Sequence, residues 1–548
     1  MAEIIDYITE ESPYWTNMFG QVPVQYDDTE EYQYVEYLES TSGGAKPGFN
    51  QTRFVLYNRD IDPYLLMHKG FIAVRGYIAT AATAGGNAEA FFNADDPTGQ
   101  IAPCNLFNFA IWDRAELRLE NSLVQKLDNP RLIALTKYLT KYAPENEKTQ
   151  GTLSFFYKDT GSGGTASQPI TTTTTATTTT ANTLRGNVYT DTADGGGGAT
   201  AANNFIKVGN EGGTGLQAGN NVDLLATGAA GSGIVLTVTA TTTTTSTSVA
   251  NLDYNQGFVS RRNRCVTRGA ATKKSFEFYL PLSDLFGFYE NYNAPFRGLK
   301  HEITLDRNLN SATYLHRDAG TANGEFVFEK ISMWIPRIKP SYEKLAELNQ
   351  KFIDKAQTVM RWSDHRYEIS NSIQQTSLSN QMRVGSLAGR PTYCYVFFQL
   401  DTTINGNQEV NKNIFSNLTN AGVGGLSQIE MRINSLAIPL QTFTVNLTED
   451  KSDYLRAYLY LLESQGKMLS DAPGMVISYE EFRTLYPLFI FDFTRIEKRM
   501  YENISASEIE VRWGLHSAAP STYKCHVIIE HDRVAVSQAV DSKLLITL

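Results

Sequence analysis

The sequence predicts an all-β protein that contains two copies of one sandwich-type domain. Three observations lead to this fold class: short strands with alternating polarity, few and short helices, and the same order of elements in both halves of the chain. The chain has 548 residues, of which 42% are hydrophobic and 11% aromatic. That is enough for more than one hydrophobic core, and two to four domains are expected at this length.

Alternation with a period of two marks the predicted strands. AELRLE (115–120) places its two leucines on one face and its charged residues on the other. HEITLDR (301–307) and EIEVRW (508–513) follow the same pattern, which is typical of antiparallel strands buried on one side. TYCYVFFQL (392–400) is apolar on both faces, so we expect it to be packed between two layers.

Three sequence signals predict helices. Asn129 followed by Pro130 is typical of the N-cap and first position of a helix, here over RLIALTKYLTKY. Residues 453–464 carry an apolar stripe at helical spacing, made of Leu455, Tyr458, Leu459 and Leu462. Ser478 and Glu481 have the spacing of a capping box.

The order of elements indicates an internal duplication. Each half has an E-x-R strand, a short helix, an aromatic-rich segment, an alternating strand and a closing strand. The corresponding pairs are Glu116/Arg118 and Glu430/Arg432, 278–292 and 480–493, Glu302 and Glu510, and 326–334 and 525–533. The first copy is longer between these markers, because a low-complexity block interrupts it.

That block runs from about residue 161 to residue 248 and is rich in threonine and glycine. It contains only six charged residues, so it cannot build a large core. It also contains β-branched pieces, FIKV (205–208) and GIVLTVTA (233–240). We interpret it as a β-type surface insertion in the first domain.

Two sandwich units of roughly 200 residues favour jelly rolls over the smaller immunoglobulin-like sandwiches. The predicted fold is therefore a double jelly roll, two consecutive jelly-roll domains. The predicted boundaries are 1–49 for an N-terminal arm and lead-in, 50–338 for the first jelly roll with its surface loop or tower at about 161–250, 339–361 for a linker, and 362–548 for the second jelly roll. We expect the apolar segment 1–20 to dock on a neighbour or an internal layer.

Charge and composition argue against several classes of protein. The net charge of −10 disfavours a broad electrostatic footprint for nucleic acid. The densest basic stretch is interpreted as a solvated loop beside a strand; it comprises Arg261, Arg262, Arg264, Arg268, Lys273 and Lys274. The first residues do not resemble a signal peptide, and no run approaches the ~18 apolar residues of a membrane span. We expect four buried free thiols, Cys104, Cys265, Cys394 and Cys525.

No pattern of residues predicts catalysis, a cofactor or a metal site. The motifs HExxH, GxSxG and Walker A are absent. The acidic doublets Asp27–Asp28 and Asp95–Asp96 are interpreted as solvated turns, and Glu508 and Glu510 as the wet face of a sheet. The seven histidines are scattered through the sequence: His68, His301, His316, His365, His516, His526 and His531. His526 and His531 are expected on opposite faces of one strand.

Several segments resemble one known family, the double jelly-roll major capsid proteins of Polintons, polinton-like viruses and virophages. The segment FYLPLSDLFGFYENYNAPFRGLKHEITLDRN (278–308) is most similar to the family, at its turn of proline, leucine and aromatic residues. The other similar segments are 101–121, 333–341, 390–399, 413–418 and 429–439. Together these matches span roughly residues 50–160 and 255–548, and the Thr/Gly-rich block has no counterpart in the family.

The resemblance implies a structural function. In this family three chains form a homotrimer whose six jelly rolls make a pseudo-hexagonal capsomer, and such capsomers tile an icosahedral capsid. It implies a virion protein assembled inside the host cell, with itself and a minor capsid or penton protein as partners and with no sequence-specific nucleic acid. Whether an internal membrane or cement protein lies beneath the shell stays open.

Two other interpretations remain. A β-sandwich adhesin or fibre-type receptor-binding protein would explain the Thr-rich block as a stalk, but not the duplicated core. A carbohydrate-active enzyme on a jelly-roll scaffold would need paired carboxylates in an aromatic groove, and the sequence places none.

Overall fold

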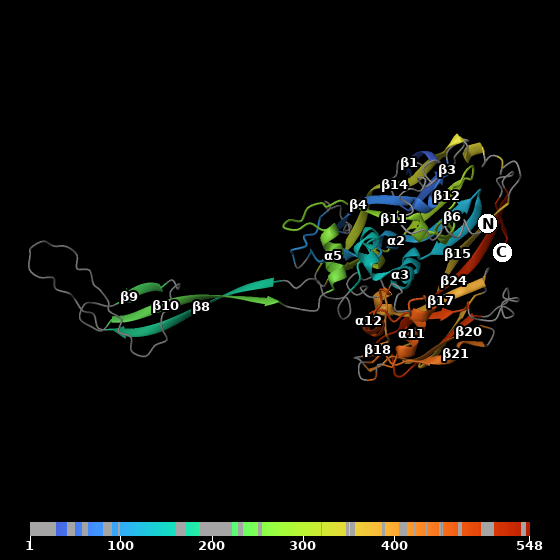
Figure 1. The fold of residues 1–548 in the computed structure, drawn as a ribbon. Coiled ribbons are helices and arrows are strands. Elements are labelled where there is room, and N and C mark those ends of the chain that lie inside the picture. The colour runs from blue at the N-terminus through green and yellow to red at the C-terminus, as the bar shows by residue number, and fades with distance from the viewer. Residues whose placement is uncertain are drawn as a thin grey trace, which may run out of the picture. The chain divides into compact units, whose positions relative to one another are not determined.

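The computed structural model describes residues 29–40, 50–56, 64–80, 90–96, 99–159, 171–186, 222–227, 234–249, 255–318, 321–342, 344–346, 350, 357–385, 390–404, 414–420, 423–433, 436–448, 451, 453–468, 474–494, 509–538 and 544–547. Within 171–249 only the backbone is described. The chain forms two compact units, one of which is Pro169–Leu252. The other contains the rest of the chain and carries both β-sandwiches (Figure 1).

The first sandwich is made of two antiparallel sheets, one of five strands and one of four. One sheet has the order β1-β14-β4-β11 and the other the order β2-β12-β6-β7. Their bounds are β1 Thr29–Leu38, β2 Gln51–Leu56, β4 Phe71–Thr80, β6 Trp112–Leu119, β7 Ser122–Asp128, β11 Phe276–Pro281, β12 His301–Arg307 and β14 Gly324–Pro340. The short strand β3 (Tyr64–Leu65) also pairs with β14, and β5 (Ile101–Pro103) pairs with β13 (Leu315–Arg317).

The second sandwich repeats this plan. Its sheets have the orders β15-β24-β17-β22 and β16-β23-β20-β21. The bounds are β15 Gln357–Ile369, β16 Ser379–Val384, β17 Arg390–Leu400, β20 Leu426–Ile433, β21 Leu436–Thr444, β22 Phe489–Asp492, β23 Ile509–Leu515 and β24 Tyr523–Gln538. β25 (Leu544–Thr547) extends the first of these sheets, and β18 (Thr419–Asn420) pairs with β19 (Val423–Gly424).

The strand order identifies both sandwiches as jelly rolls. If the eight main strands of each are counted along the chain, one sheet has the order first, eighth, third, sixth, and the other the order second, seventh, fourth, fifth. Both halves give this order, which is that of a jelly roll. The predicted fold class, an all-β double jelly roll, is therefore confirmed.

The duplication extends to single residues. Arg118 on the fourth strand of the first roll pairs with Glu302 on the seventh, and in the second roll Arg432 pairs with Glu510 at the same place. The predicted E-x-R correspondence is thus confirmed at the level of strand register. The aromatic-rich segments also correspond, because each contains the sixth main strand of its roll; the helices follow strand β11 in the first roll and precede strand β22 in the second.

Alternation of side chains builds each core, as the sequence predicted. Leu117 and Leu119 of β6 and Ile303 of β12 are fully buried in the first roll, where the Trp112 ring lies 5.8 Å from that of Phe328 on the opposite sheet. In the second roll, Trp513 of β23 packs 5.4 Å from Phe398 of β17. β17 is buried on both faces over most of its length, as expected for a strand between two layers.

The described helices are short. They are α2 Phe107–Ala110, α3 Pro130–Thr140, α4 Gln150–Leu153, α5 Gln256–Cys265, α6 Leu282–Leu285, α7 Gly287–Asn291, α8 Ser311–Tyr314, α10 Asp401–Ile404, α11 Leu455–Ser464 and α12 Tyr479–Thr484, with 3-10 turns η3 Met67–Lys69 and η5 Pro144–Lys148. The capping box of Ser478 and Glu481 is present. Asn129 and Pro130 do stand at the start of α3, but Asn129 has a φ of 56° and its side chain makes no capping bond.

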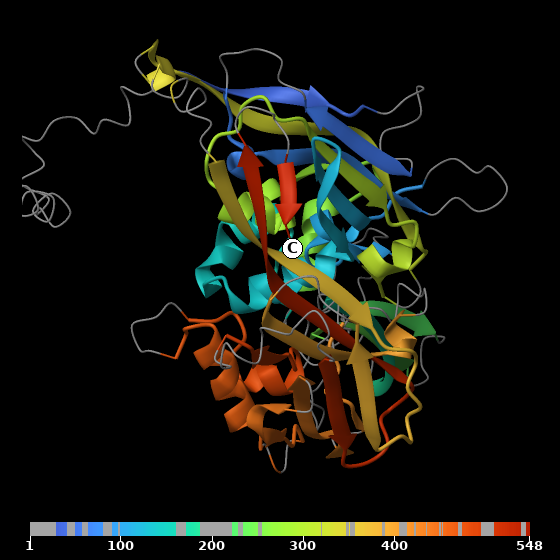
Figure 2. The ribbon, with the colours of Figure 1, turned by 90° about the vertical axis from the view of Figure 1, so that its right-hand side faces the viewer.

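The two rolls lie side by side, with the outer face of the β15-β24-β17-β22 sheet against α3, α7 and β7 of the first roll (Figure 2). Gly287 in α7 lies at this junction, where a Cβ atom would lie 2.0 Å from the backbone oxygen of Ser363 on β15. The rolls therefore meet through backbone as well as side chains.

Replacing Gly287 by alanine should lower the free energy of unfolding by roughly 1–3 kcal/mol, because overpacking forces the backbones apart. Urea denaturation of the purified chain would measure the change. Gly474→Ala is the control, since its Cβ atom would make only ordinary contact with Pro144 at 3.6 Å. Equal midpoints for Gly287→Ala and the unchanged protein would contradict this packing.

The smaller unit is a three-stranded antiparallel sheet with the order β8-β10-β9, where β8 is Thr171–Gly186, β9 Val222–Thr227 and β10 Ile234–Val249. It lies in the chain between β7 and β11 of the first roll. The prediction of a β-type insertion is confirmed. FIKV (205–208) and the N-terminal segment 1–20 lie outside the described residues, and the proposed domain boundaries remain a prediction.

Candidate functional site

The strongest candidate for a functional region is the junction between the rolls, because it joins the two duplicated units. α3 begins at Pro130 and every one of its residues is buried. One side of α3 faces the core of its own roll, and its C-terminal end meets the second roll. The two buried cations of the helix are satisfied within the first roll: Arg131 donates to the backbone oxygens of Asn105 and Thr313, and Lys137 pairs with Asp284 and Glu290.

An ion pair links the rolls at the end of α3. The Lys141 Nζ atom lies 2.9 Å from Oε1 and 3.0 Å from Oε2 of Glu530 on β24. Glu530 is 4% exposed, and the Tyr395 hydroxyl also donates to it at 3.4 Å. Burial alone would raise the pKa of the Glu530 carboxyl, but Lys141 and His365 outweigh that effect and hold the pKa below its usual range.

A second charged group lies along the same junction. The Arg533 Nη1 atom donates to the backbone oxygen of Val124 on β7 at 3.1 Å and to Oδ2 of Asp364 on β15 at 3.0 Å. The Arg533 guanidinium lies 6.0 Å from the ring centroid of Trp362, and the Trp362 and Phe288 ring centroids are 5.2 Å apart. Burial raises the pKa of Asp364, with His531 and Arg533 opposing the shift.

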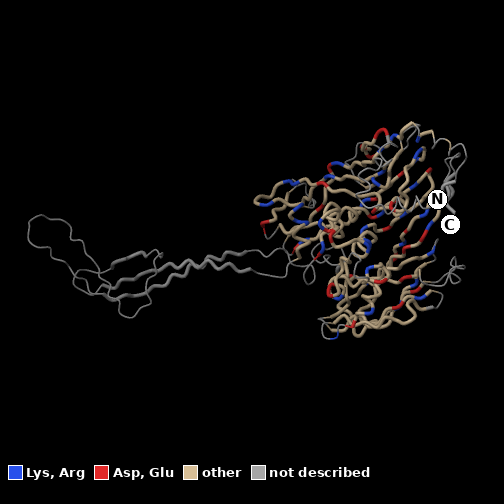
Figure 3. The backbone as a smooth tube through the Cα atoms, viewed as in Figure 1, with Lys and Arg blue, Asp and Glu red and all other residues tan. Residues whose placement is uncertain are grey.

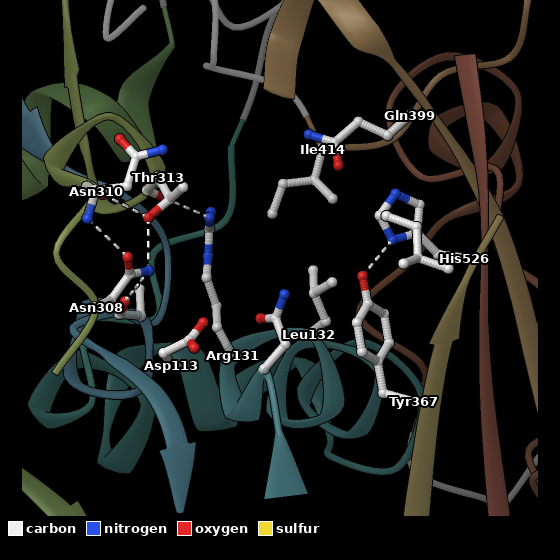
Figure 4. A pocket seen from close by; sticks show the side chains of 13 residues that line it. Asp113, Arg131, Leu132, Asn308, Asn310, Thr313, Tyr367, Gln399, Ile414 and His526 are labelled. Atoms are coloured by element: carbon white, nitrogen blue, oxygen red, sulfur yellow. Dashed lines mark hydrogen bonds between the residues drawn. The ribbon is translucent and has the colours of Figure 1, made fainter. Parts of the chain in front are cut away.

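A cavity of about 290 Å³, lined by both polar and apolar side chains, opens between the rolls (Figure 4). Asp113, Arg131 and Asn308 line it from the first roll, and Tyr367 and His526 from the second. The Tyr367 hydroxyl bonds to Nδ1 of His526 at 3.0 Å. Burial lowers the pKa of His526 to about 3, so its imidazole is neutral near pH 7 and is a poor proton acceptor there. The cavity can hold water or a small polar molecule, but it presents no activated nucleophile.

The other predicted candidates are explained by structural roles. Asp95 accepts from Arg268 Nε and from the backbone nitrogen of Gly269, each at 2.9 Å, so its carboxylate is neutralised within the fold. Among the described residues, no group of three or more His, Cys, Asp or Glu side chains is arranged to hold a metal ion. The four cysteines are buried free thiols, as predicted. Asp27, Asp28 and Glu508 lie outside the described residues.

The seven histidines are dispersed. His301 and His526 each bond a tyrosine hydroxyl, at 2.9 Å and 3.0 Å, and His516 Nε2 contacts the Val445 backbone oxygen at 3.1 Å. His365 and His531 each lie 3.9 Å from an acidic oxygen on the neighbouring strand, and His68 and His316 lie apart from these in the first roll.

Two predictions about charge are wrong, one of them in part. The basic stretch is a solvated loop beside a strand only at Arg268 and Lys273, whereas Arg261 and Arg262 lie on α5 and are 1% and 2% exposed. Arg261 donates to the Pro103 and Tyr157 backbone oxygens and to Asp159. These acceptors inside the fold satisfy the buried guanidinium. Glu510 is not on a wet face: it is 8% exposed and pairs with Arg512 at 2.7 Å.

The other basic side chains of the stretch also have partners within the fold, so the stretch is not an open site for a polyanion. Arg264 donates to the Thr152 and Glu277 backbone oxygens, Arg268 pairs with Asp95, Lys273 pairs with Glu329, and Lys274 donates to Asn263. In the described part of the chain, Lys and Arg are interspersed with Asp and Glu over both rolls (Figure 3).

The model for the double jelly roll-like domain matches residues 227–535, more than half of the chain. The chain belongs to this family. The family model and the strand order of both rolls agree, so the double jelly roll is established by sequence and by fold. Within the described residues, no helix is long and apolar enough to cross a membrane.

Three solved structures with a similar arrangement come from viruses. The structure of the Sputnik virophage has 11% identity, a TM-score of 0.49, and coverage of 95% of this chain and 89% of that one. The mavirus major capsid protein has 12% identity, a TM-score of 0.42, and coverage of 98% and 95%. The Faustovirus major capsid protein has 10% identity, a TM-score of 0.44, and coverage of 100% and 97%. With TM-scores below 0.5, these likenesses add nothing to the family assignment. No curated protein matches the sequence.

Proposed function

We propose that the chain is a major capsid protein, which forms homotrimeric pseudo-hexagonal capsomers that tile an icosahedral shell. The observation that carries the proposal is the duplication itself: one chain holds two jelly rolls with the same strand order, joined side by side. Three such chains in a ring present six equivalent blocks, and a six-sided tile can cover a flat facet. The single-residue correspondence of Arg118/Glu302 with Arg432/Glu510 shows how closely the two blocks match.

Further support comes from the sequence. The segments 101–121 and 278–308 resemble the capsid proteins of polinton-like viruses and virophages, and the chain belongs to the double jelly roll-like family. The buried charges at the roll junction are used in holding the rolls together, so the role we propose is structural and not catalytic. The expected location is the virion shell, with assembly inside the host cell and with a minor capsid or penton protein as a further partner.

Light scattering of the purified chain, with negative-stain images, tests this function. We expect a stable trimer of about three times 61.0 kDa with a hexagonal outline, or closed shells. A monomer over a range of salt and protein concentrations would overturn the proposal and would favour an adhesin, for which glycan binding would be the next measurement.

A further inference from the structure

The helices α3 and α11 occupy the same place in their respective rolls but differ in burial. Each is the first helix after the fifth main strand of its roll, β7 for α3 and β21 for α11. All residues of α3 are buried, whereas in α11 only Ala457, Leu461 and Ser464 are buried. The difference calls for a physical explanation, because the two rolls otherwise share strand order and register.

The explanation for α3 lies in the second roll. The outer face of the β15-β24-β17-β22 sheet covers the side of α3 that its own core leaves open, as the Lys141–Glu530 pair at 2.9 Å marks. In the described residues nothing equivalent covers α11. Leu455 is 54% exposed, and Leu459 and Leu462 are only partly buried.

The apolar stripe noted in the sequence is divided by the fold. Tyr458 and Leu462 are partly buried and pack against the core, whereas Leu455 is 54% exposed and the buried side of the helix carries Ala457. α11 therefore has apolar residues on a second side, which a helix needs only when it is covered on two sides.

Among the described residues, the first roll has a matching surface that no other element covers. The β1-β14-β4-β11 sheet corresponds strand for strand to the sheet that covers α3. Its outer face carries a row of aromatic rings from three strands: Tyr34 lies 6.0 Å from Phe71, and Phe71 lies 5.7 Å from Tyr279. Tyr32 and Tyr34 are 49% and 44% exposed. Exposed tyrosines on a continuous sheet face are typical of protein interfaces.

We propose that α11 of one copy packs on the outer face of the β1-β14-β4-β11 sheet of the next copy. This contact would repeat between chains the contact that α3 makes within one chain. It joins two different surfaces, so it is heterologous and builds a ring. The inference rests on the proposed capsomer and names the two surfaces that form it. The contact would also bury the exposed Leu455 of α11 and the exposed Tyr32 and Tyr34 of the aromatic row.

Paired substitutions test the two surfaces. Leu455→Glu changes α11 and Tyr34→Glu changes the sheet face, and both side chains are exposed in the single chain, so each variant should fold. Leu378→Glu is the matched control, because Leu378 is 50% exposed but lies on neither surface. Light scattering should give a trimer for the unchanged chain and for Leu378→Glu. Leu455→Glu and Tyr34→Glu should be monomers, and each monomer should still show a cooperative thermal melting transition, because its own fold is intact.

The outcomes separate this inference from the proposed function. Trimers of both Leu455→Glu and Tyr34→Glu would overturn the assignment of these surfaces and leave the capsomer intact. A monomeric unchanged chain would overturn both.

Cysteine cross-linking supplies a second measurement, which is needed if a variant fails to fold. Leu455→Cys combined with Tyr32→Cys or Tyr34→Cys should give chains linked by a bismaleimide, with the single-cysteine variants as controls. No linkage from any pair in a trimeric sample would also overturn the assignment.

Discussion

Replacing Lys141 by alanine should lower the free energy of unfolding by roughly 3–5 kcal/mol, the usual cost of leaving a buried charge without its partner. The Glu530 side chain is only 5% exposed and receives its closest ion pair from Lys141. Without that ammonium group, burial governs the carboxyl and its pKa should rise above the usual range. Because the folded-state pKa then exceeds the unfolded value, protonation stabilises the variant. The loss in free energy of unfolding, relative to the unchanged protein, should be largest near about pH 7.5 and should become smaller as the pH falls toward the raised pKa of Glu530.

Denaturant unfolding of both proteins at several pH values measures this effect. Lys126→Ala is the control: its partner Asp128 is 49% exposed, and such surface pairs contribute about 0–1 kcal/mol. The double variant Lys141→Met with Glu530→Gln should recover part of the loss, because neither group is then charged. A loss for Lys141→Ala no larger than for Lys126→Ala would contradict the role assigned to the pair.

As the pH is lowered, the protein should lose stability at a higher pH than protonation of its carboxylates alone would cause. Burial lowers the pKa of His301 and His526 to about 3 and that of His365 to about 4, from an ordinary value of 6.5. Below pH 6.5 the unfolded chain therefore binds more protons than the folded chain. The free energy of unfolding falls by about 1.4 kcal/mol per pH unit for each such imidazole, down to its folded-state pKa.

The measurement is the free energy of unfolding between pH 7 and pH 4, at constant ionic strength. His365→Gln should reduce the slope by about one proton, since the glutamine does not titrate. His516→Gln is the comparison, because His516 is exposed. Identical slopes for the unchanged protein and His365→Gln would show that His365 does not stay neutral in the folded state.

The fold was predictable because period-two alternation reports burial directly. Leu117, Ile303 and Val511 are buried where the pattern places them, and the E-x-R repeat gave the correspondence of the two rolls. The Thr/Gly-rich insertion was visible from composition. These features are local, so a short stretch of sequence contains the information.

The junction between the rolls was not predictable, because it depends on residues far apart in the chain. Lys141 and Glu530 are separated by 389 positions, and neither stands in a motif. The buried cations of α5 were misread for the same reason, since Arg261 is satisfied by carbonyl oxygens that carry no sequence signal. The apolar stripe of α11 did have a signal. Hydrophobicity alone does not say which members of the stripe are covered: Tyr458 and Leu462 pack against the core, whereas Leu455 is exposed.

The pairing of β8 with β10 has a consequence for engineering. Thr171 and Val249 form the last rung of the ribbon, so the segment of almost eighty residues between them leaves and returns through neighbouring positions. The cost of closing such a connection depends on the separation of its ends and only weakly on what lies between them. The ribbon can therefore serve as a display site: any module whose termini lie across one antiparallel rung can replace it without changing the register of either jelly roll.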